Sequence, residues 1–402
     1  MIRKRIAPLV LAVILCFGTV LAAGQYAREW TSTYIKPGVI ATATERLLPT
    51  LFQGTILQSI ALQYPNVVPM YGSSEFDHGG KYNPMRLFAD RPTGWTPYLV
   101  GQPGCTDIIQ ALFAGAQNLR GKHVIISVSD QWFHPGGVAQ KTFAANFSAL
   151  QAYEMLLNPD LTTATKRALA QRLSQFTVIQ NDYPVLERIL MHYGQNDPWS
   201  RLKEALLWPA GRVELASLQI QDALNTVNVV QHLPAKEIAR NAAGKTHRVL
   251  HAWPIMLRQA TAAVAKNETN NPFGINNQFF TQQIKPSLKK FRNSALNARL
   301  YPSPEYADLD LLLQVLHDEG AHTILLIQPI NGRWYDYTGF PKQQLRHYVK
   351  LVHAAAGRYG VTVADFSGHA YDKYFMDDPS HPSEKGWLEF DETLDRFVHQ
   401  TS

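Results

Sequence analysis

The sequence has only two cysteines among its 402 residues, Cys16 and Cys105. Cys16 lies in an apolar run near the amino terminus and Cys105 lies well beyond that run, so we expect no intrachain disulfide. A cysteine cluster, a His-Glu-x-x-His sequence and a phosphate-binding P-loop sequence are all absent. The sequence therefore predicts neither a bound metal ion nor another cofactor.

Charged residues are also scarce, at 17% of the chain, whereas hydrophobic residues make up 46%. This composition provides enough apolar material for a large core and argues against long disordered segments. The formal net charge of +6 favours anionic surroundings such as phosphate polymers or lipid headgroups. No basic run is interleaved with aromatic residues, so we expect no nucleic acid binding.

One long apolar run is present, at the amino terminus. Three basic residues at positions 3–5 precede an uncharged stretch over residues 6–27, close to the roughly 20 residues that span a bilayer core. The basic flank predicts a cytoplasmic amino terminus and an extracellular location for the chain beyond about residue 28. A signal peptide cleaved at Ala22-Ala23 is the alternative, but the run is longer than a usual signal core. We therefore predict a cytoplasmic tip and a single-pass, uncleaved anchor in the cell membrane over residues 1–28.

Apolar runs typical of buried strands recur along the rest of the chain, at residues 67–71, 123–128, 323–327 and 361–366. Helical patterns lie between them. Strands alternating with helices predict an α/β fold in three layers, with a central parallel sheet.

Two further segments complete the predicted organisation. Residues 29–65 read as a helical stalk between the anchor and an extracellular domain that comprises residues 66–402. Successive helical patterns from residue 140 to about residue 235 contain too much helix for one crossover between parallel strands. We interpret them as a helical insertion that caps one side of the sheet.

The strand predicted at residues 67–71 ends in Gly72-Ser73-Ser74, which predicts a sharp turn that presents a hydroxyl at the carboxyl edge of the sheet. A serine needs a base that is itself oriented by a third group. Asp378 and His381, three residues apart near the carboxyl terminus, provide such a pair. We predict Ser74 as the nucleophile, His381 as its base and Asp378 as the partner of the imidazole, with Ser73 as the alternative nucleophile.

Candidate donors to an oxyanion lie on two other predicted loops. Gly101 and Gly104 belong to a glycine-rich loop whose backbone can approach a substrate closely, although an ordinary turn is the alternative. Gln131 follows the strand predicted at residues 123–128 and is a third candidate. Residues 194–197 match the Gly-x-Asn-Asp sequence of SGNH hydrolases, but they follow a helix, so we interpret the match as chance.

In order along nearly the whole chain, these motifs and several others resemble the DltD family of teichoic acid D-alanylation. The residues that carry the resemblance follow a basic-flanked anchor and are Gly72-Ser73-Ser74-Glu75, Gln131-Trp132-Phe133 with Gly136, Asn271-Pro272-Phe273-Gly274, Asn331-Gly332-Arg333-Trp334-Tyr335, and Asp378-Pro379-Ser380-His381 with Gly386-Trp387.

The resemblance implies an SGNH-hydrolase-like domain outside the membrane that transfers D-alanyl groups to lipoteichoic acid, with Ser74, Asp378 and His381 as its catalytic residues. It also implies a membrane-bound O-acyltransferase partner, DltB, and an indirect dependence on the carrier protein DltC. Asn331 and Arg333 are predicted substrate contacts. Arg333, Lys81 and Arg86 are candidates for binding teichoic phosphates, although each is better explained as a solvated surface charge. No well-placed Gly-x-Asn-Asp is present, which leaves the third oxyanion donor open.

Two other functions fit the same residues. An esterase or thioesterase would use the same three side chains with water as the acceptor of the acyl group. A non-catalytic scaffold would hold teichoic chains or recruit the acyltransferase without using Ser74.

Overall fold

The computed structural model describes residues 2–35, 37–44, 52–195, 197–233 and 250–400, with the backbone alone at residues 2–14, 16, 37, 41 and 42. Its centre is a sheet of five parallel strands in the order β2-β1-β3-β4-β5. The strands are β1 (Val67–Tyr71), β2 (Thr96–Val100), β3 (His123–Val128), β4 (His322–Ile327) and β5 (Thr362–Asp365). Because all five run the same way, their carboxyl ends lie along one edge. The predicted α/β fold with a central parallel sheet is confirmed.

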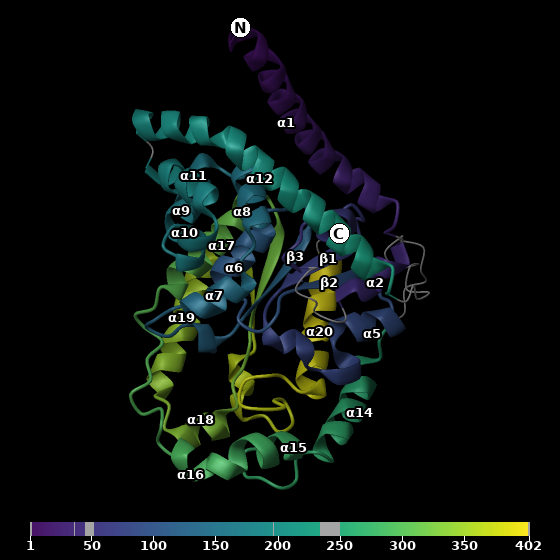
Figure 1. Ribbon diagram of the computed structural model, residues 1–402. Helices are drawn as coiled ribbons and strands as arrows, with labels where there is room; N and C mark the ends of the chain where they lie inside the picture. The colour runs from purple at the N-terminus through teal and green to yellow at the C-terminus, as the bar shows by residue number, and fades with distance from the viewer. Residues whose placement is uncertain (1, 36, 45–51, 196, 234–249, 401–402) are drawn as a thin grey trace.

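Helices cover both faces of the sheet, because side chains along each buried strand alternate between two apolar cores. Val67 and Tyr71 of β1 face the larger core, whereas Val68 and Met70 face the smaller one. The helices that contribute to the larger core include α6 (Asp107–Gly115), α17 (Glu305–Asp318) and α19 (Lys342–Arg358). Those of the smaller core are α5 (Pro84–Asp90), α14 (Trp253–Ala265) and α20 (Glu384–Gln400); in Figure 1 the first set lies on the left and the second set on the right.

A second group of helices extends the larger core on one side, over the region predicted to be a helical insertion. It consists of α7 (Gln140–Asn146), α8 (Ala149–Leu157), α9 (Thr163–Leu173), α10 (Thr177–Asp182), α11 (Pro184–Gln195) and α12 (Pro198–Val230). Asp197 begins α12 as its N-cap, accepting hydrogen bonds from the backbone N–H groups of Trp199 and Ser200 at 3.0 Å. The chance match at residues 194–197 thus joins two helices, although residue 196 lies outside the described residues.

Short helices and turns lie before β1 and in the segments that connect or follow the strands. They are α2 (Pro37–Ala43), α4 (Ile56–Ala61), α15 (Asn277–Phe279), α16 (Leu288–Phe291) and α18 (Gly332–Thr338), together with the 3₁₀ or π turns at residues 74–77, 80–82, 130–132, 280–284, 285–287 and 367–371.

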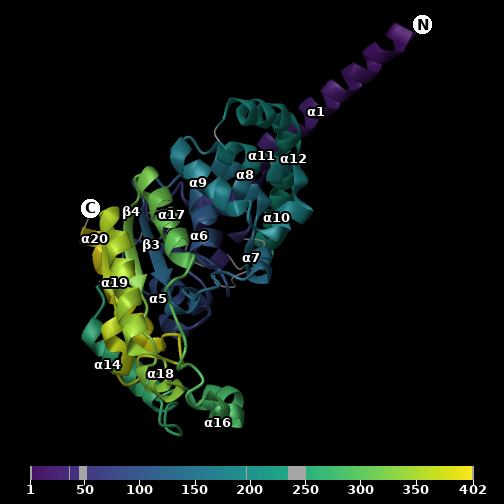
Figure 2. The same ribbon diagram turned by 90° about the vertical axis from the view of Figure 1, so that its left-hand side faces the viewer.

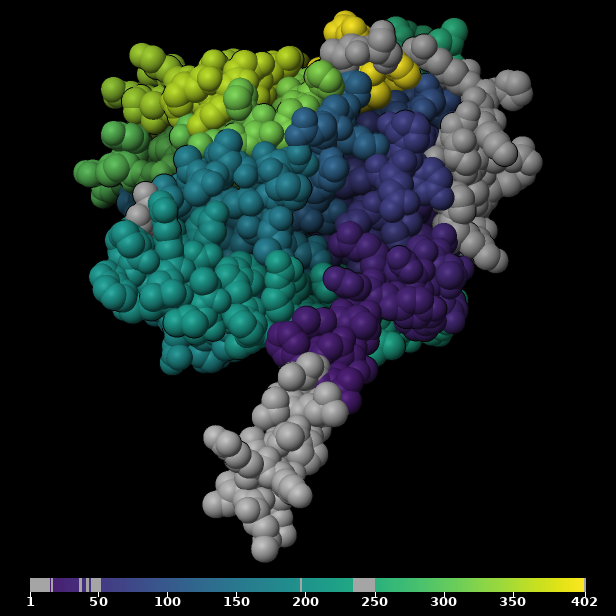
Figure 3. All heavy atoms as spheres, turned by 90° about the horizontal axis from the view of Figure 1, so that it is seen from above, coloured from purple at the N-terminus to yellow at the C-terminus, as the bar shows by residue number. Residues whose placement is uncertain are grey.

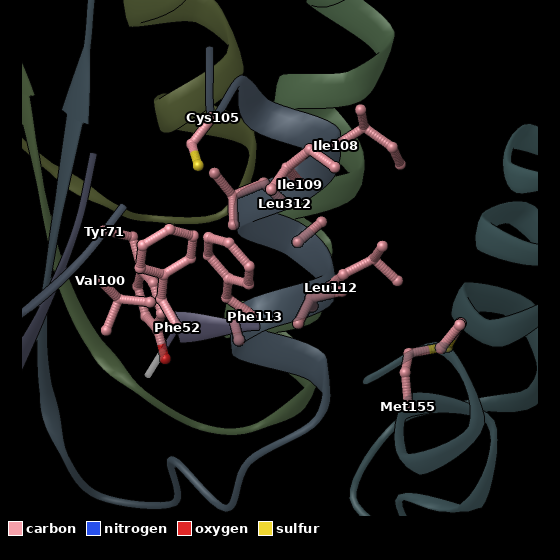
Figure 4. Close-up of a cluster of buried hydrophobic side chains, with 14 of the residues drawn as sticks. Phe52, Tyr71, Val100, Cys105, Ile108, Ile109, Leu112, Phe113, Met155 and Leu312 are labelled. Atoms are coloured by element: carbon pink, nitrogen blue, oxygen red, sulfur yellow. The ribbon is translucent and has the colours of Figure 1, made fainter. Parts of the chain in front are cut away.

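The segment predicted to be a stalk, residues 29–65, packs into the domain through several of its apolar side chains. Ile35, Ile40 and Phe52 belong to the larger core. Figure 4 shows Phe52 beside Tyr71 and Phe113, and the ring centres of Phe52 and Phe113 are 6.0 Å apart. This packing ties the segment to β1 and α6.

The first helix, α1 (Ile2–Ser32), runs out of the domain at its amino-terminal end (Figures 1 and 2). Its carboxyl-terminal part packs on α12: a methyl group added to Gly24 would lie 2.8 Å from the Cα of Ala216. Arg28 also forms an ion pair with Glu154 of α8 at 3.5 Å. In the part of the chain that the structure describes, no helix is both long enough and apolar enough to cross a membrane. The side chains of residues 2–14 and 16 lie outside that part, and the anchor stays a prediction.

Candidate active site

A tight turn after β1 presents Ser74 at the carboxyl edge of the sheet. The turn folds back on itself, since a Cβ on Gly72 would lie 2.3 Å from a carboxylate oxygen of Glu75 and 2.6 Å from the ring of Phe76. The buried Glu75 side chain accepts the backbone N–H of Ser73 at 3.0 Å. Only glycine fits at position 72, and the resulting turn leaves Ser74 half-buried at the start of a 3₁₀ helix.

Ser74, His381 and Asp378 form one continuous hydrogen-bonded chain. The Ser74 hydroxyl lies 2.9 Å from Nε2 of His381, and Nδ1 of His381 lies 2.7 Å from Oδ2 of Asp378. Oδ1 of Asp378 accepts the backbone N–H groups of Ser380 and His381, each at 2.8 Å. Because an ionised carboxylate only accepts, Nδ1 of His381 carries a proton and donates it in a hydrogen bond to Asp378, which leaves Nε2 as the acceptor for the serine hydroxyl. This is the arrangement that activates a serine for attack on a carbonyl carbon.

The environment keeps Asp378 ionised and raises the pKa of His381. Burial alone would raise the pKa of Asp378, but the hydrogen bond and charge of His381, with the two backbone donors, bring the pKa below its ordinary value. Burial alone would lower the pKa of His381, yet the hydrogen bond and charge of Asp378, reinforced by Glu75, raise it. The imidazole is therefore a stronger base than a free histidine while 21% of its side chain stays exposed.

Ser73 is engaged elsewhere. Its buried hydroxyl donates to the carbonyl oxygen of Gln102 at 3.1 Å and accepts the backbone N–H of Gly104 at 3.1 Å. These bonds join the turn after β1 to the glycine loop after β2. Of the two candidate nucleophiles, only Ser74 lies against the imidazole in this structure.

The three predicted oxyanion donors have different surroundings in the structure. Gly101 lies directly beside the Ser74 turn, with φ of +152° and its α-carbon facing the backbone of Gly72. The N–H of Gly104 is directed to Ser73. Gln131 is exposed at the end of β3, and among the described residues no hydrogen bond joins its side chain to Ser74 or His381. The oxyanion roles stay predictions, and the position of Gly101 fits such a role best.

Replacing Gly101 with alanine is expected to destabilise the protein by about 1–3 kcal/mol, because a Cβ there would lie 2.1 Å from the carbonyl oxygen of Gly72 in a backbone conformation that side chains rarely adopt. The free energy of unfolding by chemical denaturation would measure the loss. Gly121→Ala is the matched control: its φ of +68° is also left-handed, but no atom lies within 4 Å of the added carbon. An equal loss for both variants would contradict the proposed close contact.

His78 stacks on His381. The two ring centres are 4.1 Å apart and the planes differ by only 6°. Nδ1 of His78 lies 3.9 Å from a carboxylate oxygen of Asp377, so a second histidine–aspartate pair lies against the first. Sequence reasoning missed this residue, although His78 lies in the polar loop that follows Ser74.

His78, Asp378 and His381 are also the one group of metal-ligating side chains found close together in the described part of the chain. Asp378 is already bonded to Nδ1 of His381. Two parallel stacked rings direct their lone pairs along parallel planes and not toward one shared ion. The arrangement is therefore better explained as a supported imidazole than as a metal centre.

Replacing His78 with alanine is expected to shift the ascending limb of the pH–activity profile to higher pH. Burial lowers the pKa of His381, and removal of the stacked ring would expose one face of the imidazole to water and weaken that effect. A pH profile of kcat/KM would detect the change. His78→Phe keeps a ring on that face and is expected to keep the wild-type limb. Identical profiles for all three proteins would contradict a role for the stack.

Other loops hold the Asp378–His381 loop in place. The buried Asn331 donates its backbone N–H to the carbonyl oxygen of Pro379 at 3.0 Å, while its side chain caps α18 and donates to the carbonyl oxygen of Phe273 at 3.0 Å. The amide of Asn331 is thus engaged within the protein. Its predicted contact with substrate, and that of the half-buried Arg333, which bonds the carbonyl oxygen of Tyr371 at 2.8 Å, stay predictions.

Lys81 and Arg86 lie on the surface near the Ser74 turn. Lys81 is 4.8 Å from the centre of the Tyr82 ring, and Arg86 donates to the carbonyl oxygen of Gly80 at 3.1 Å. Their side chains are exposed, as expected for solvated charges.

A buried polar network that the sequence analysis missed extends from Glu75 across the sheet. Burial raises the pKa of Glu75, and hydrogen bonds from Ser73 and Ser127 oppose that rise. The Ser127 hydroxyl in turn accepts a hydrogen bond from the side chain of Gln328 at 2.7 Å. The network links the ends of β1, β3 and β4 beneath Ser74, and it gives the turn a rigid base.

Two cavities open near this edge. One of about 380 Å³ is acidic, with Asp77, His78, Glu268, Asp377 and Glu384 among its lining residues. Burial, together with the charge of Asp377, raises the pKa of Glu268 to about 8. The other cavity, of about 250 Å³, is mainly apolar and lies beside Asp130 and Gln328. The acidic lining of the first disfavours phosphate groups there.

Comparison with known proteins identifies the family. Residues 44–399 match the family model described as DltD protein. Protein DltD of Bacillus subtilis (strain 168) is 32% identical over 397 residues, covering 98% of this chain and 97% of that protein. Protein DltD of Lacticaseibacillus rhamnosus is 27% identical, covering 99% of this chain and 91% of its own. Protein DltD of Staphylococcus aureus (strain NCTC 8325 / PS 47) is also 27% identical, and the match covers 91% of this chain and 90% of that protein. The chain belongs to the DltD family.

Proposed function

We propose that this protein transfers D-alanyl groups onto lipoteichoic acid by acyl transfer through Ser74. The observation that carries the proposal is the unbroken chain from the Ser74 hydroxyl through His381 to the buried, ionised Asp378. Family membership supports teichoic acid D-alanylation as the pathway. A reactive serine at the edge of a parallel sheet supports an SGNH-like chemistry within that pathway.

In the proposed first half-reaction, Oγ of Ser74 attacks the carbonyl carbon of a D-alanyl donor while Nε2 of His381 takes the hydroxyl proton. The negative charge on the carbonyl oxygen is stabilised by the backbone N–H of Ser74 and a donor on the Gly101 loop. The tetrahedral intermediate then collapses, the leaving group departs with the proton from His381, and a D-alanyl ester of Ser74 remains.

In the second half-reaction, His381 removes the proton from a glycerol-phosphate hydroxyl of the polymer. The resulting oxygen attacks the D-alanyl-Ser74 ester, and the proton returns from His381 to Oγ of Ser74 as the product leaves. Asp378 stays ionised throughout and stabilises the imidazolium formed in each half. The exposed part of His381 gives the acceptor access to its base.

We further propose that α1 anchors the protein in the cell membrane, with the amino terminus in the cytoplasm and the sheet domain outside. The basic residues at positions 3–5 and the uncharged run that follows support this placement. DltB is the proposed membrane partner, and DltC would act indirectly. The net charge of +6 favours approach of the polymer phosphates, with Arg333, Lys81 and Arg86 as proposed contacts.

Purified full-length protein incubated with a D-alanyl thioester and a glycerol-phosphate oligomer tests the proposal. Alanine bound to the oligomer is the expected product, and the Ser74→Ala variant is expected to yield none. Release of free alanine at the same rate with and without the oligomer would instead identify an esterase. If Ser74→Ala cells retain normal D-alanine on their teichoic acid, the protein acts as a scaffold and the catalytic proposal is wrong.

A further inference from the structure

The amino-terminal half of α12 exposes a stripe of large apolar side chains. Trp199, Leu202 and Leu206 are 72%, 51% and 72% exposed. Their spacing of three and four residues places them on one face of the helix. The side of the helix opposite Leu202 faces the domain: Glu204, Leu207 and Trp208 are half-buried there, and the buried Gly211 lies close enough to α11 for an added Cβ to approach Ile189 within 2.7 Å. The exposed stripe is therefore not needed to hold α12 on the domain.

Polar and basic groups border this stripe. Lys203 and Arg212 are exposed on the same helix, and the Arg212 guanidinium lies 5.3 Å from the centre of the Trp208 ring. The Trp208 N–H donates to Glu204 at 2.9 Å. Exposed tryptophan and leucine beside lysine and arginine is the composition of helices that lie in the interface of an anionic membrane. Tryptophan suits that depth because its ring is apolar and its N–H is polar.

The position of the stripe relative to α1 indicates the same surroundings. Figure 1 shows the amino-terminal part of α12 on the side of the domain from which α1 runs out, and Figure 3 looks onto this side. The close contact of Gly24 with Ala216 and the Arg28–Glu154 ion pair hold α1 against the domain at this end. A bilayer that receives the amino-terminal part of α1 would thus meet the exposed face of α12.

From these observations we propose that Trp199, Leu202 and Leu206 insert into the headgroup region of an anionic lipid bilayer, as a second membrane contact beside α1. The inference rests on the membrane placement of α1 proposed above. Two contacts would fix the tilt of the domain, which one helix alone leaves free. In Figure 1 the carboxyl edge of the sheet, with α15, α16 and α18, lies at the far end of the domain from this surface. The lipid contact therefore holds the candidate active site away from the bilayer, where an extended polymer can reach it.

Quenching of tryptophan fluorescence by brominated lipids tests the contact in the full-length protein. The protein would be reconstituted into vesicles of phosphatidylcholine and phosphatidylglycerol with bromine near the headgroup end of the acyl chains. Wild-type protein is expected to lose more fluorescence than Trp199→Phe. That difference is expected to vanish in a Leu202→Glu, Leu206→Glu double variant, which still floats with the vesicles through α1. Folding of each variant would be checked by its thermal unfolding, which substitutions at exposed positions leave unchanged.

Leu224 provides the matched control. It is 57% exposed, on the same helix and on the same angular face as Leu206, but about 27 Å further along the axis. Leu224→Glu is expected to leave the quenching difference intact. Protein that floats but shows equal quenching of wild type and Trp199→Phe would overturn this inference alone. Protein that fails to float would overturn the anchor as well. Cross-linking of position 206 to a membrane protein, without quenching by lipid, would assign the stripe to that protein and overturn the lipid contact.

Discussion

Replacing Ser74 with alanine is expected to lower kcat for acyl transfer by on the order of 10⁴-fold or more, because no other hydroxyl lies against His381 among the described residues. Binding of the donor is expected to change little, since alanine removes one oxygen from a half-buried position. Steady-state rates with a D-alanyl thioester would measure the loss. Mass spectrometry of the wild-type protein trapped during turnover is expected to find the D-alanyl group on the peptide that contains Ser74.

Ser73→Ala is the matched control, since it removes the same oxygen from the adjacent residue. It deletes the hydrogen bonds to Gln102 and Gly104 but leaves the Ser74–His381 contact, so a loss of stability of about 1–3 kcal/mol is expected with most of the activity retained. An inactive Ser73→Ala protein that carries no acyl group, together with an active Ser74→Ala protein, would exchange the roles of the two serines. If both variants keep the activity of the wild type, neither serine is the nucleophile and the mechanism is contradicted.

The parts of this fold that follow from local composition were predictable. Continuous apolar runs predicted β1, β3 and β4, since a strand buried on both faces carries few polar residues, and they also predicted β5, which is mostly not buried. The strand β2 was missed, although all five of its residues are buried. Proline favours an edge strand, and β2 with Pro97 does lie at the edge of the sheet, whereas β1 lies inside the sheet although it contains Pro69.

The candidate site was only partly predictable. The Gly-Ser-Ser turn and the Asp-x-x-His spacing are local signals, and the structure brings their side chains together across 307 positions. Contacts that depend on loop conformation had no such signal. Glutamate is rarely fully buried, and no local pattern marks Glu75 as an exception; it is buried in the structure, where hydrogen bonds from Ser73 and Ser127 stabilise its carboxylate. The stack of His78 on His381 likewise depends on how two distant loops meet.

The long helix α12 shows a second limit of prediction from the sequence. Its sequence carries both a buried and an exposed apolar stripe, and the pattern alone does not separate core positions from surface positions. Which of its leucines are buried is decided by the neighbouring helices α11 and α1, which pack against it.

Asp378→Asn is expected to lower kcat by roughly 10⁴-fold while leaving the backbone of the loop in place. An amide can donate to Nδ1 and so stabilise the tautomer that places the proton on Nε2, which is wrong for accepting the Ser74 proton. The variant also removes the charge that raises the pKa of His381, so the remaining activity is expected to rise at lower pH than in the wild type. The pH profile of kcat/KM would show both effects. Asp377→Asn, the adjacent acid, lies outside the hydrogen-bonded chain and is expected to keep most of the rate.

The ion pair between Asp378 and His381 is also expected to stabilise the folded protein within a definite range of pH. The lowered pKa of Asp378 stabilises the folded protein at pH values above 3.8, the pKa of this group in the unfolded chain. This stabilisation is lost as the pH falls through the lower pKa of the folded state. The raised pKa of His381 stabilises the folded protein fully at pH values below 6.5, the pKa of this group in the unfolded chain. This stabilisation is lost as the pH rises through the higher pKa of the folded state. The difference in unfolding free energy between wild type and Asp378→Asn is therefore expected to be largest between about pH 4 and 6.5 and to shrink on both sides. A difference that stays constant from pH 3 to pH 9 would contradict an ion pair between these two side chains, and with it the electrostatic basis of the proposed catalysis.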